Sequence, residues 1–377
     1  MIYLDNAATT KPCQAAIDAM MKSAEMFANP SSLYGIGLDA EKEINGARSE
    51  IANALGVSSK NIYFTSGGTE ANNMVILGAA EAMKKRGTHV ITTKIEHPSV
   101  LESFKRLEQN GYTVTYLTPD EDGRISIDEL KSAADKETTL ISVMHVNNET
   151  GVIQPVEEIR DAVKDIAPNV LIHSDCVQSF GKITVNANKL NADFITVSAH
   201  KIHGFKGCGA AYISDTRKIR PIILGGGQQD GIRPGTENAG GIMAFGAAVK
   251  EMKPEPEKMR ELRLLLKDEL LKRLDNVKFN GSDEYNSGSV LNVSILGVRA
   301  EILLHSLEAR GVYVSTGSAC STHKPEPSHV LTAMGLKHKE IDGAMRLSFS
   351  RNTTAEEVIA AAEIIAEEAA NIRRIMR

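Results

Sequence analysis

The sequence predicts an α/β protein of two domains, the larger built on a mostly parallel, doubly wound sheet. Through the first two thirds of the chain, short apolar runs alternate with amphipathic stretches, as strands do with crossover helices. The pattern breaks at residues 253–257, where two prolines lie among charged residues. The length of 377 residues also exceeds that of one average domain. We therefore place a domain boundary at this break.

Each element follows from a local pattern. Apolar runs predict seven strands, at residues 62–65, 89–93, 113–117, 139–144, 170–174, 194–197 and 209–213. Amphipathic stretches at 70–85, 98–110 and 155–165 predict the helices between them. Beyond the break we expect a charged helix up to about Arg273, strands at 290–295 and 345–349, and a last helix over 355–377. The larger domain is thus expected at residues 15–254, and a smaller α+β domain at 1–14 and 255–377.

Charge and cysteine spacing exclude several classes of protein. A net charge of −5 argues against direct binding to nucleic acid or to an anionic membrane. The first ten residues do not resemble a secretion signal, and no run of 18 apolar residues predicts a membrane span, so we expect a cytoplasmic protein. The four cysteines are scattered and form no Cys-x-x-Cys pair, which predicts neither a metal site nor a disulfide framework.

Polar side chains follow the predicted strands at the points where the strands end. These are Thr69, His97, Asn148, Asp175, Ser198, His200 and Lys201. In open parallel sheets, ligands bind at the carboxyl ends of the strands. We therefore expect these residues to converge on one crevice.

One of these strand ends has the pattern of a phosphate site. The segment 65–70 (Thr-Ser-Gly-Gly-Thr-Glu) follows a strand and opens a helix, so the backbone at Gly68 and Thr69 can approach a phosphate closely. The alternative is an ordinary turn capped by Thr69. An amine in the same crevice could form a Schiff base, and Lys201 follows a buried strand, although Lys206 is a local rival and most lysines are solvated.

Three further residues suit an aromatic cofactor ring. Asp175 can pair with a pyridinium nitrogen, and Gln178 can hydrogen-bond a phenolic oxygen. The alternatives are a turn cap and a surface amide. His97 is either a stacking, proton-transferring imidazole or an ordinary residue preceding a helix.

The region beyond the domain boundary contributes two candidates. Cys320 lies in a run of small residues, which suits a reactive thiol in an exposed loop rather than a buried apolar one. Arg346 places a charge within an apolar strand, so it is either paired internally or available to a carboxylate. We favour carboxylate binding.

Taken together, these motifs resemble the cysteine desulfurases of the NifS/IscS type, group I, within the class V pyridoxal-phosphate enzymes of fold type I. The resemblance spans nearly the whole chain. It is carried by residues 3–10 (YLDNAATT), 66–73 (SGGTEANN), 96–97 (EH), 145–151 (HVNNETG), 175–178 (DCVQ), 198–201 (SAHK), 233–238 (RPGTEN) and 317–320 (GSAC).

The resemblance implies a role for each candidate residue. Lys201 would hold pyridoxal 5'-phosphate as a Schiff base, Asp175 would pair with its ring nitrogen and His97 would stack on the ring. Phosphate contacts would come from Gly68, Thr69, Ser198 and His200, and from Thr236 of a second subunit in a homodimer with shared active sites. Asn148 and Gln178 would bind the ring oxygen or the substrate, and Arg346 the substrate carboxylate.

The activity implied is the conversion of L-cysteine to L-alanine. Lys201 would remove the α proton, and the Cys320 thiolate would take the sulfur as a persulfide and pass it to an acceptor, either an iron-sulfur scaffold or a thiolation enzyme. One alternative keeps the cofactor, as a selenocysteine lyase or another class V aminotransferase. An alternative of another class is a non-catalytic sulfur-relay or scaffold protein.

Overall fold

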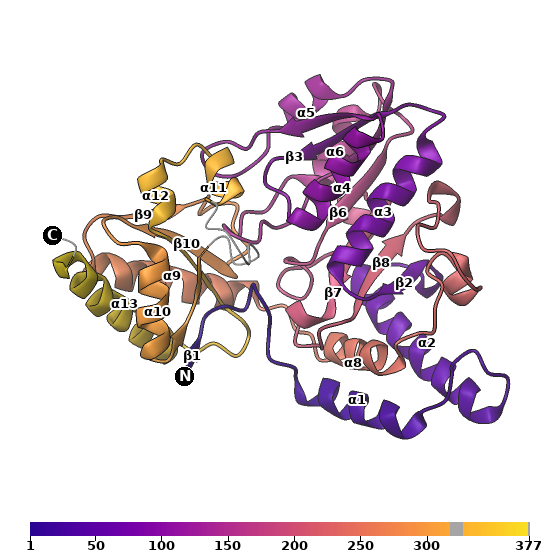
Figure 1. Cartoon of the computed structure of the whole chain (residues 1–377), viewed down its shortest axis with the longest axis horizontal. Coiled ribbons are helices and arrows are strands. Elements are labelled where there is room, and N and C mark those ends of the chain that lie inside the picture. Colours follow the sequence, from indigo (N-terminus) through magenta and orange to yellow (C-terminus); the bar gives the residue numbers. More distant parts are fainter. Residues whose placement is uncertain (317–326, 376–377) are drawn as a thin grey trace.

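The computed structural model describes residues 1–316 and 327–375, and it has a larger and a smaller unit side by side (Figure 1). The larger unit has a seven-stranded sheet in the order β2-β8-β7-β6-β5-β3-β4. Strand β8 runs antiparallel to both of its neighbours, and the pairs from β7 to β4 are parallel. The predicted α/β class with a mostly parallel seven-stranded sheet is thereby confirmed.

The seven strands lie where the apolar runs predicted them, to within two residues at either end. They are β2 (Ile62–Thr65), β3 (His89–Thr93), β4 (Thr113–Leu117), β5 (Thr138–Ser142), β6 (Leu171–Asp175), β7 (Phe194–Ser198) and β8 (Gly209–Ile213). The helices of this unit are α1 (Gln14–Met26), α2 (Gly35–Leu55), α3 (Gly68–Met83), α4 (Pro98–Gln109), α5 (Ile127–Ala133), α6 (Val156–Val163), α7 (Ala187–Leu190) and α8 (Ala239–Lys250).

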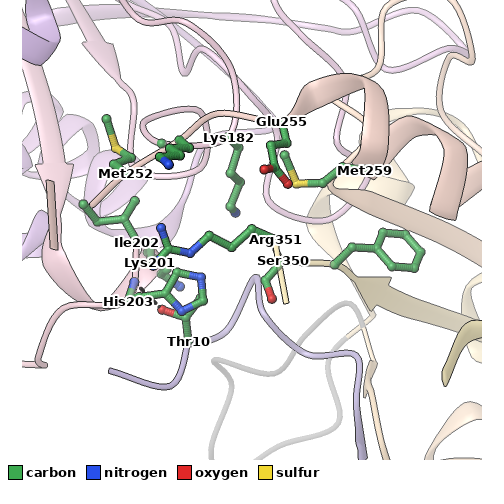
Figure 2. A pocket seen from close by; sticks show the side chains of 13 residues that line it. Thr10, Lys182, Lys201, Ile202, His203, Met252, Glu255, Met259, Ser350 and Arg351 are labelled. Carbon is green, nitrogen blue, oxygen red and sulfur yellow. Dashed lines mark hydrogen bonds between the residues drawn. The ribbon is translucent and has the colours of Figure 1, made fainter. Parts of the chain in front are cut away.

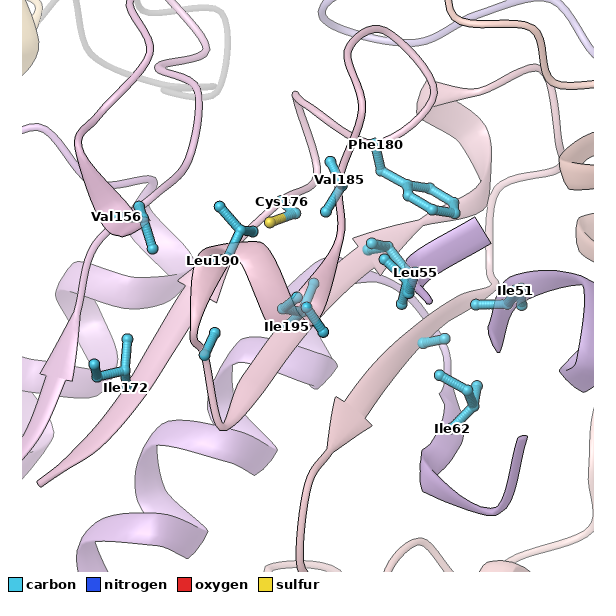
Figure 3. Packing of buried hydrophobic residues seen from close by; sticks show 14 of the residues in the cluster. Ile51, Leu55, Ile62, Val156, Ile172, Cys176, Phe180, Val185, Leu190 and Ile195 are labelled. Atoms are coloured by element: carbon cyan, nitrogen blue, oxygen red, sulfur yellow. The ribbon is translucent and has the colours of Figure 1, made fainter. Parts of the chain in front are cut away.

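The sheet is buried on both faces, which explains why its strands are continuous apolar runs. Successive side chains alternate between two cores: Ile172 packs with α2, α6 and α8, whereas Leu171 packs with α3 and α4. Ile195 and Phe194 divide in the same way. Figure 3 shows part of the first core, where Leu55 of α2 and Leu190 of α7 lie near Ile195.

The smaller unit has a four-stranded antiparallel sheet in the order β12-β13-β10-β9. Its elements are α9 (Pro256–Arg273), β9 (Val277–Asn280), β10 (Val290–Ile295), α10 (Ala300–Ala309), β11 (Val312–Tyr313), β12 (Ser315–Thr316), α11 (His329–Ala333), α12 (His338–Asp342), β13 (Ala344–Ser348) and α13 (Ala355–Ile375). The first strand of the chain, β1 (Ile2–Tyr3), pairs with β11 of this unit, whereas α1 packs against α8 of the larger one. Residues between β1 and α1 therefore cross from one unit to the other.

Among the described residues, no helix combines the length and apolar character that a membrane span requires.

The polar strand ends of the large sheet face the smaller unit. Strands β2, β3, β5, β6 and β7 run in the same direction, so their carboxyl ends share one edge of the sheet.

Candidate active site

The first strand end forms a cup of backbone N–H groups. Helix α3 begins at Gly68 directly after β2, and its N-cap Gly67 has a φ of +154°, which favours glycine. Among the described residues, the first-turn N–H groups of Gly68, Thr69 and Glu70 have no hydrogen-bond acceptor. A Cβ at Gly68 would lie 2.8 Å from Cγ2 of Val177, so the cup lies close against the end of β6. Such a cup suits a phosphate group.

A buried chain of hydrogen bonds joins the ends of β6 and β3. Asp175 Oδ2 accepts a bond of 2.7 Å from the side-chain amide of Asn72, and the same amide nitrogen lies 2.9 Å from Ser99 Oγ. Ser99 Oγ in turn lies 2.8 Å from Nδ1 of His97. Burial lowers the pKa of His97, and the nearby charge of Lys201 acts in the same direction, while Asp175 opposes both. His97 and Asp175 thus belong to one connected cluster.

Lys201 lies at the end of the short 3-10 helix (Ala199–Lys201) that follows β7. Its Nζ donates to the carbonyls of Ala7 at 2.6 Å and Ala8 at 2.8 Å. The Ala7 carbonyl also accepts from Nε2 of Gln178 at 2.9 Å. The segment after β1 therefore connects Lys201 and Gln178, two residues that the sequence placed at separate strand ends.

A second lysine, Lys182, is buried beside this group. Its Nζ donates to Oε1 of Gln178 at 2.5 Å, which fixes the orientation of the Gln178 amide. Burial lowers the pKa of Lys182 to about 7, and the charges of Lys201 and Arg346 add to the effect. Figure 2 shows Lys182 and Arg351 extending into a small pocket between the two units that Lys201 also lines.

Arg346 occupies the middle of β13 and is paired internally. Its Nη2 bonds Asp5 Oδ1 at 2.9 Å, and its Nη1 donates to the backbone carbonyl of Asn148 at 3.1 Å. The internal pairing that the sequence left open is thus present. Nε of Arg346 is buried and has no partner among the described residues, so one edge of the guanidinium is not used by these bonds. Its role in binding a substrate carboxylate stays a prediction.

Two buried carboxyl groups lie near these residues, Glu96 near Asp175 and Glu149 near Arg346. Burial raises the pKa of Glu96 to about 8, although the N–H of Met144 and the hydroxyl of Thr93 both donate to it. Burial likewise raises the pKa of Glu149 to about 7, although Ser328 donates to it at 2.5 Å. Both groups are therefore poised to be protonated near neutral pH.

The remaining predicted residues are placed as follows. Ser198 ends β7 beside Gly68, with its Cβ 3.7 Å from the position that a Gly68 Cβ would take. His200 Nδ1 lies 3.1 Å from Thr9 Oγ1, and burial lowers its pKa to about 4. Thr236 lines a separate pocket with Ser66 of the same chain. Cys320 lies outside the described residues. The predicted roles of all these residues remain untested by these contacts.

Sequence reasoning gave no individual role to several residues that complete the site. Asn72 and Ser99 stand within or beside the family motifs, but neither has a local pattern that assigns it a partner. Lys182 follows Gln178 by four residues, but residues 177–182 form turns and a β-bridge and no helix, so this spacing does not predict that the two side chains meet. Asp5 also belongs to a family motif, but no local pattern could have paired it with Arg346.

These residues fit pyridoxal 5'-phosphate. The cup at Gly68 has unpaired N–H groups for a phosphate, Lys201 supplies an amine, and Asp175 supplies a carboxylate. Among residues 1–316 and 327–375, no group of three or more His, Cys, Asp or Glu side chains is placed to hold a metal ion.

Curated relatives match the chain over almost its full length. Cysteine desulfurase IscS of Methanosarcina thermophila is 41% identical over 99% of this chain and 93% of its own length. Cysteine desulfurase IscS of Dictyoglomus turgidum is 42% identical over 95% of this chain and 91% of its own length.

Solved structures agree with these relatives. A NifS-like protein superposes with a TM-score of 0.90 at 38% identity, covering 97% of this chain and 98% of that protein. SspA in complex with cysteine superposes with a TM-score of 0.83 at 34% identity, over 93% and 99% of the two chains. The aminotransferase class-V family profile matches residues 2–360. The chain therefore belongs to the class-V aminotransferase family and, within it, to the pyridoxal-phosphate-dependent cysteine desulfurases.

Proposed function

We propose that this enzyme converts L-cysteine to L-alanine and takes the sulfur onto Cys320 as a persulfide. The observation that carries the proposal is the cluster at the sheet edge, where the phosphate cup, the amine of Lys201 and the linked pair of His97 and Asp175 lie together. The relatives named cysteine desulfurase and the neighbour solved with cysteine support the choice of substrate.

In this proposal each half of the site has its own task. Pyridoxal phosphate, when bound, supplies the electron sink that stabilises negative charge at Cα of the substrate. The Lys201 amine removes the Cα proton, and Arg346 orients the substrate carboxylate. The Cys320 thiolate then attacks the substrate sulfur: a sulfur–sulfur bond forms, the Cβ–S bond breaks, and its electron pair stays on the carbon skeleton. Two protons return to that skeleton to give alanine.

The test is to incubate the holoenzyme with L-cysteine and to measure alanine together with persulfide on each cysteine by mass spectrometry. We expect alanine in step with a 32-dalton mass increase on the peptide that contains Cys320. Cys320→Ser should stop both products. Cys13→Ser is the matched control, because Cys13 is a partly exposed thiol outside the cluster. Alanine formed at an unchanged rate by Cys320→Ser would refute the proposed nucleophile.

We also propose a homodimer in which Thr236 completes the phosphate site of the partner. Large apolar side chains are exposed around the α1–α2 connection and at residues 222–224, where a second subunit could cover them. Phe27 is 83% exposed, Leu33 92% and Leu224 86%.

A mixed dimer tests both parts of this idea. One subunit carries Lys201→Ala and the other carries Thr236→Ala. The homodimer of either variant is expected to have little or no activity. If Thr236 acts across the interface, the mixed dimer contains one fully native site and regains about half of the normal activity per dimer. If Thr236 acts within its own chain, no native site is formed and activity is not regained. A protein that sediments as a monomer would exclude the arrangement altogether.

The acceptor of the sulfur is proposed to be an iron-sulfur scaffold or a thiolation enzyme in the cytoplasm. The IscS relatives and the acidic net charge of −5, which disfavours nucleic acid or membrane binding, support this view. Transfer of ³⁵S from the labelled persulfide to each class of purified acceptor would distinguish the two. Retention of all label on Cys320 with both would contradict the proposal.

A further inference from the structure

The hydrogen bonds between Asp175 and His97 pass through two residues, Asn72 and Ser99. Asn72 lies in the second turn of α3 and is 1% exposed, and Ser99 lies in the first turn of α4 and is 7% exposed. Water therefore has little access to either side chain. Hydrogen bonds made by buried side chains are strong determinants of how those side chains are oriented.

The orientation of the Asn72 amide is fixed by its partners. Oδ1 accepts from the hydroxyl of Thr196 at 2.5 Å, and Nδ2 faces a carboxylate oxygen of Asp175 at 2.7 Å. The two hydrogens on Nδ2 are directed to Asp175 and to Ser99 Oγ. A rotated amide would place its oxygen against the Asp175 carboxylate, which is unfavourable. Asn72 is therefore a donor toward Ser99.

The direction of donation continues to His97. Because Ser99 Oγ accepts from Asn72, its own hydrogen is available to Nδ1 of His97, 2.8 Å away. The backbone N–H of Ser99 also donates to Nδ1, at 3.1 Å, because His97 is the N-cap residue of α4. Nδ1 thus faces two donors and carries no hydrogen of its own.

We infer that Asn72 and Ser99 are positioning residues that hold His97 as the neutral tautomer with its hydrogen on Nε2, and that the amide of Asn72 thereby joins His97 to Asp175. The lowered pKa of His97 agrees with a neutral ring. The catalytic consequence rests on the proposed function. In this tautomer Nε2 carries a hydrogen and the lone pair of Nδ1 is occupied by two donors. Lys201 and not His97 is therefore the base for the Cα proton.

The direct test is ¹⁵N NMR of the holoenzyme with labelled histidine, with His97 assigned from the spectrum of His97→Gln. The Nε2-protonated tautomer has an Nδ1 resonance shifted well away from that of a protonated nitrogen. We expect one tautomer between pH 6.5 and 8. A protonated Nδ1, or an averaged mixture of tautomers, in the wild-type protein would overturn the inference without any variant.

Variants then test the two positioning residues. In Ser99→Ala and Asn72→Asp we expect a second tautomer or the imidazolium form to appear in the same pH range. Ser103→Ala is the control for Ser99, since Ser103 is as buried but donates to the backbone carbonyl of Ser99 and leaves the Ser99 hydroxyl in place. Asn73→Asp is the control for Asn72, since it adds the same charge one residue further along, on a half-buried side chain that donates to the backbone carbonyls of Thr69 and Ser99 and to no part of the chain of side chains. Equal spectra for variants and controls would refute the assigned role.

Activity provides a second readout. We expect Ser99→Ala to lower kcat with cysteine on the order of tenfold, with KM changed less than twofold, and Ser99→Thr, which keeps the hydroxyl, to recover most of it. The tautomer is read whether or not the protein turns over cysteine. An inactive protein with the Nε2 tautomer would therefore contradict the proposed function alone, and an active protein with a protonated Nδ1 would contradict this inference alone.

Discussion

The two halves of the active site are held in different ways. In the large-unit half, His97 and Asp175 are connected through side chains of the neighbouring helices α3 and α4, within about one hundred residues of sequence. In the small-unit half, Arg346 is fixed by Asp5 and by the carbonyl of Asn148, across 341 and 198 residues of sequence. The first half is a property of one sheet edge, and the second depends on how the two units meet.

Asp175→Asn is expected to have the largest effect, in the large-unit half. The two oxygens of Asp175 accept from Asn72 and from the backbone N–H of Val177, so the NH2 of an asparagine would meet one of these donors, and its neutral amide could not balance a charged ring nitrogen. We expect kcat for alanine formation to fall by roughly 10²- to 10⁴-fold, with the fold intact by circular dichroism. Asp193→Asn, at a buried aspartate that directly precedes β7 and pairs with Arg160 and Lys218, controls for loss of a buried carboxylate. A loss of activity of less than tenfold would mean that catalysis depends less on the hydrogen bonds of Asp175 in the large-unit half than those bonds suggest.

Arg346→Met tests the small-unit half. It leaves Asp5 without its partner, so unfolding should require about 2 to 4 kcal/mol less free energy, and KM for cysteine should rise. Urea denaturation and initial rates measure the two effects. Arg310→Met is the control, because Arg310 pairs with Glu367 and Glu368 at the surface and should change stability by less than about 1 kcal/mol. A rise in KM without loss of stability would mean that the internal pairing contributes little.

Glu96 lies where the two units meet, with its backbone carbonyl bonded to His329, and Glu96→Gln tests how the free energy of unfolding depends on pH there. The pKa of Glu96 is about 8 in the folded protein, above its ordinary value of 4.5, so the folded state holds a proton that the unfolded state releases. The free energy of unfolding should therefore fall as pH rises from about 4.5 to about 8. Glu96→Gln lacks this loss and should be more stable than wild type by about 1 to 3 kcal/mol at pH 9. Parallel stability curves for the two apoproteins would contradict the raised pKa.

Ser328→Ala is expected to have the smallest effect. Ser328 caps α11 and also donates to the buried Glu149, so its loss should cost about 1 to 2 kcal/mol of stability. Ser126→Ala removes a cap from α5 without touching a buried carboxyl group, and it should cost about 1 kcal/mol or less. Thermal unfolding of the two variants measures the difference. Equal losses would show that the bond to Glu149 adds nothing to the cap.

The sequence predicted the large-unit half better than the small-unit half for a physical reason. Parallel strands buried on both faces are continuous apolar runs, and the residue after each run must lie at one edge of the sheet. The amino-acid pattern alone therefore places Asp175, Ser198 and Lys201 at that edge. It does not identify Lys182 as a partner of Gln178, because a buried lysine and a solvated one have the same local sequence pattern.

Pairing in the small-unit half had no local signal at all. Asp5 and Arg346 meet only because β1 pairs with β11 and β13 lies beside the chain that follows. A charge within an apolar strand indicated that Arg346 has a specific partner, but its identity depends on the packing of units. Similarly, Asn72 lies within the motif at 66–73 and Ser99 lies close to the motif at 96–97, but no sequence pattern predicts the hydrogen bond between their side chains.

The segment that follows β1 has a consequence for how the protein is made. Its carbonyls accept hydrogen bonds from Lys201 and Gln178, and its Asp5 pairs with Arg346. All three partners are synthesised long after the segment itself. At ordinary rates of translation, residues 2–10 remain without these partners for a time on the order of half a minute. The sheet of the larger unit can form during that interval, because its strands end with β8 at Ile213. Residues 2–10 therefore leave the ribosome before their partners in the active site, and they reach their final contacts after those partners have been made.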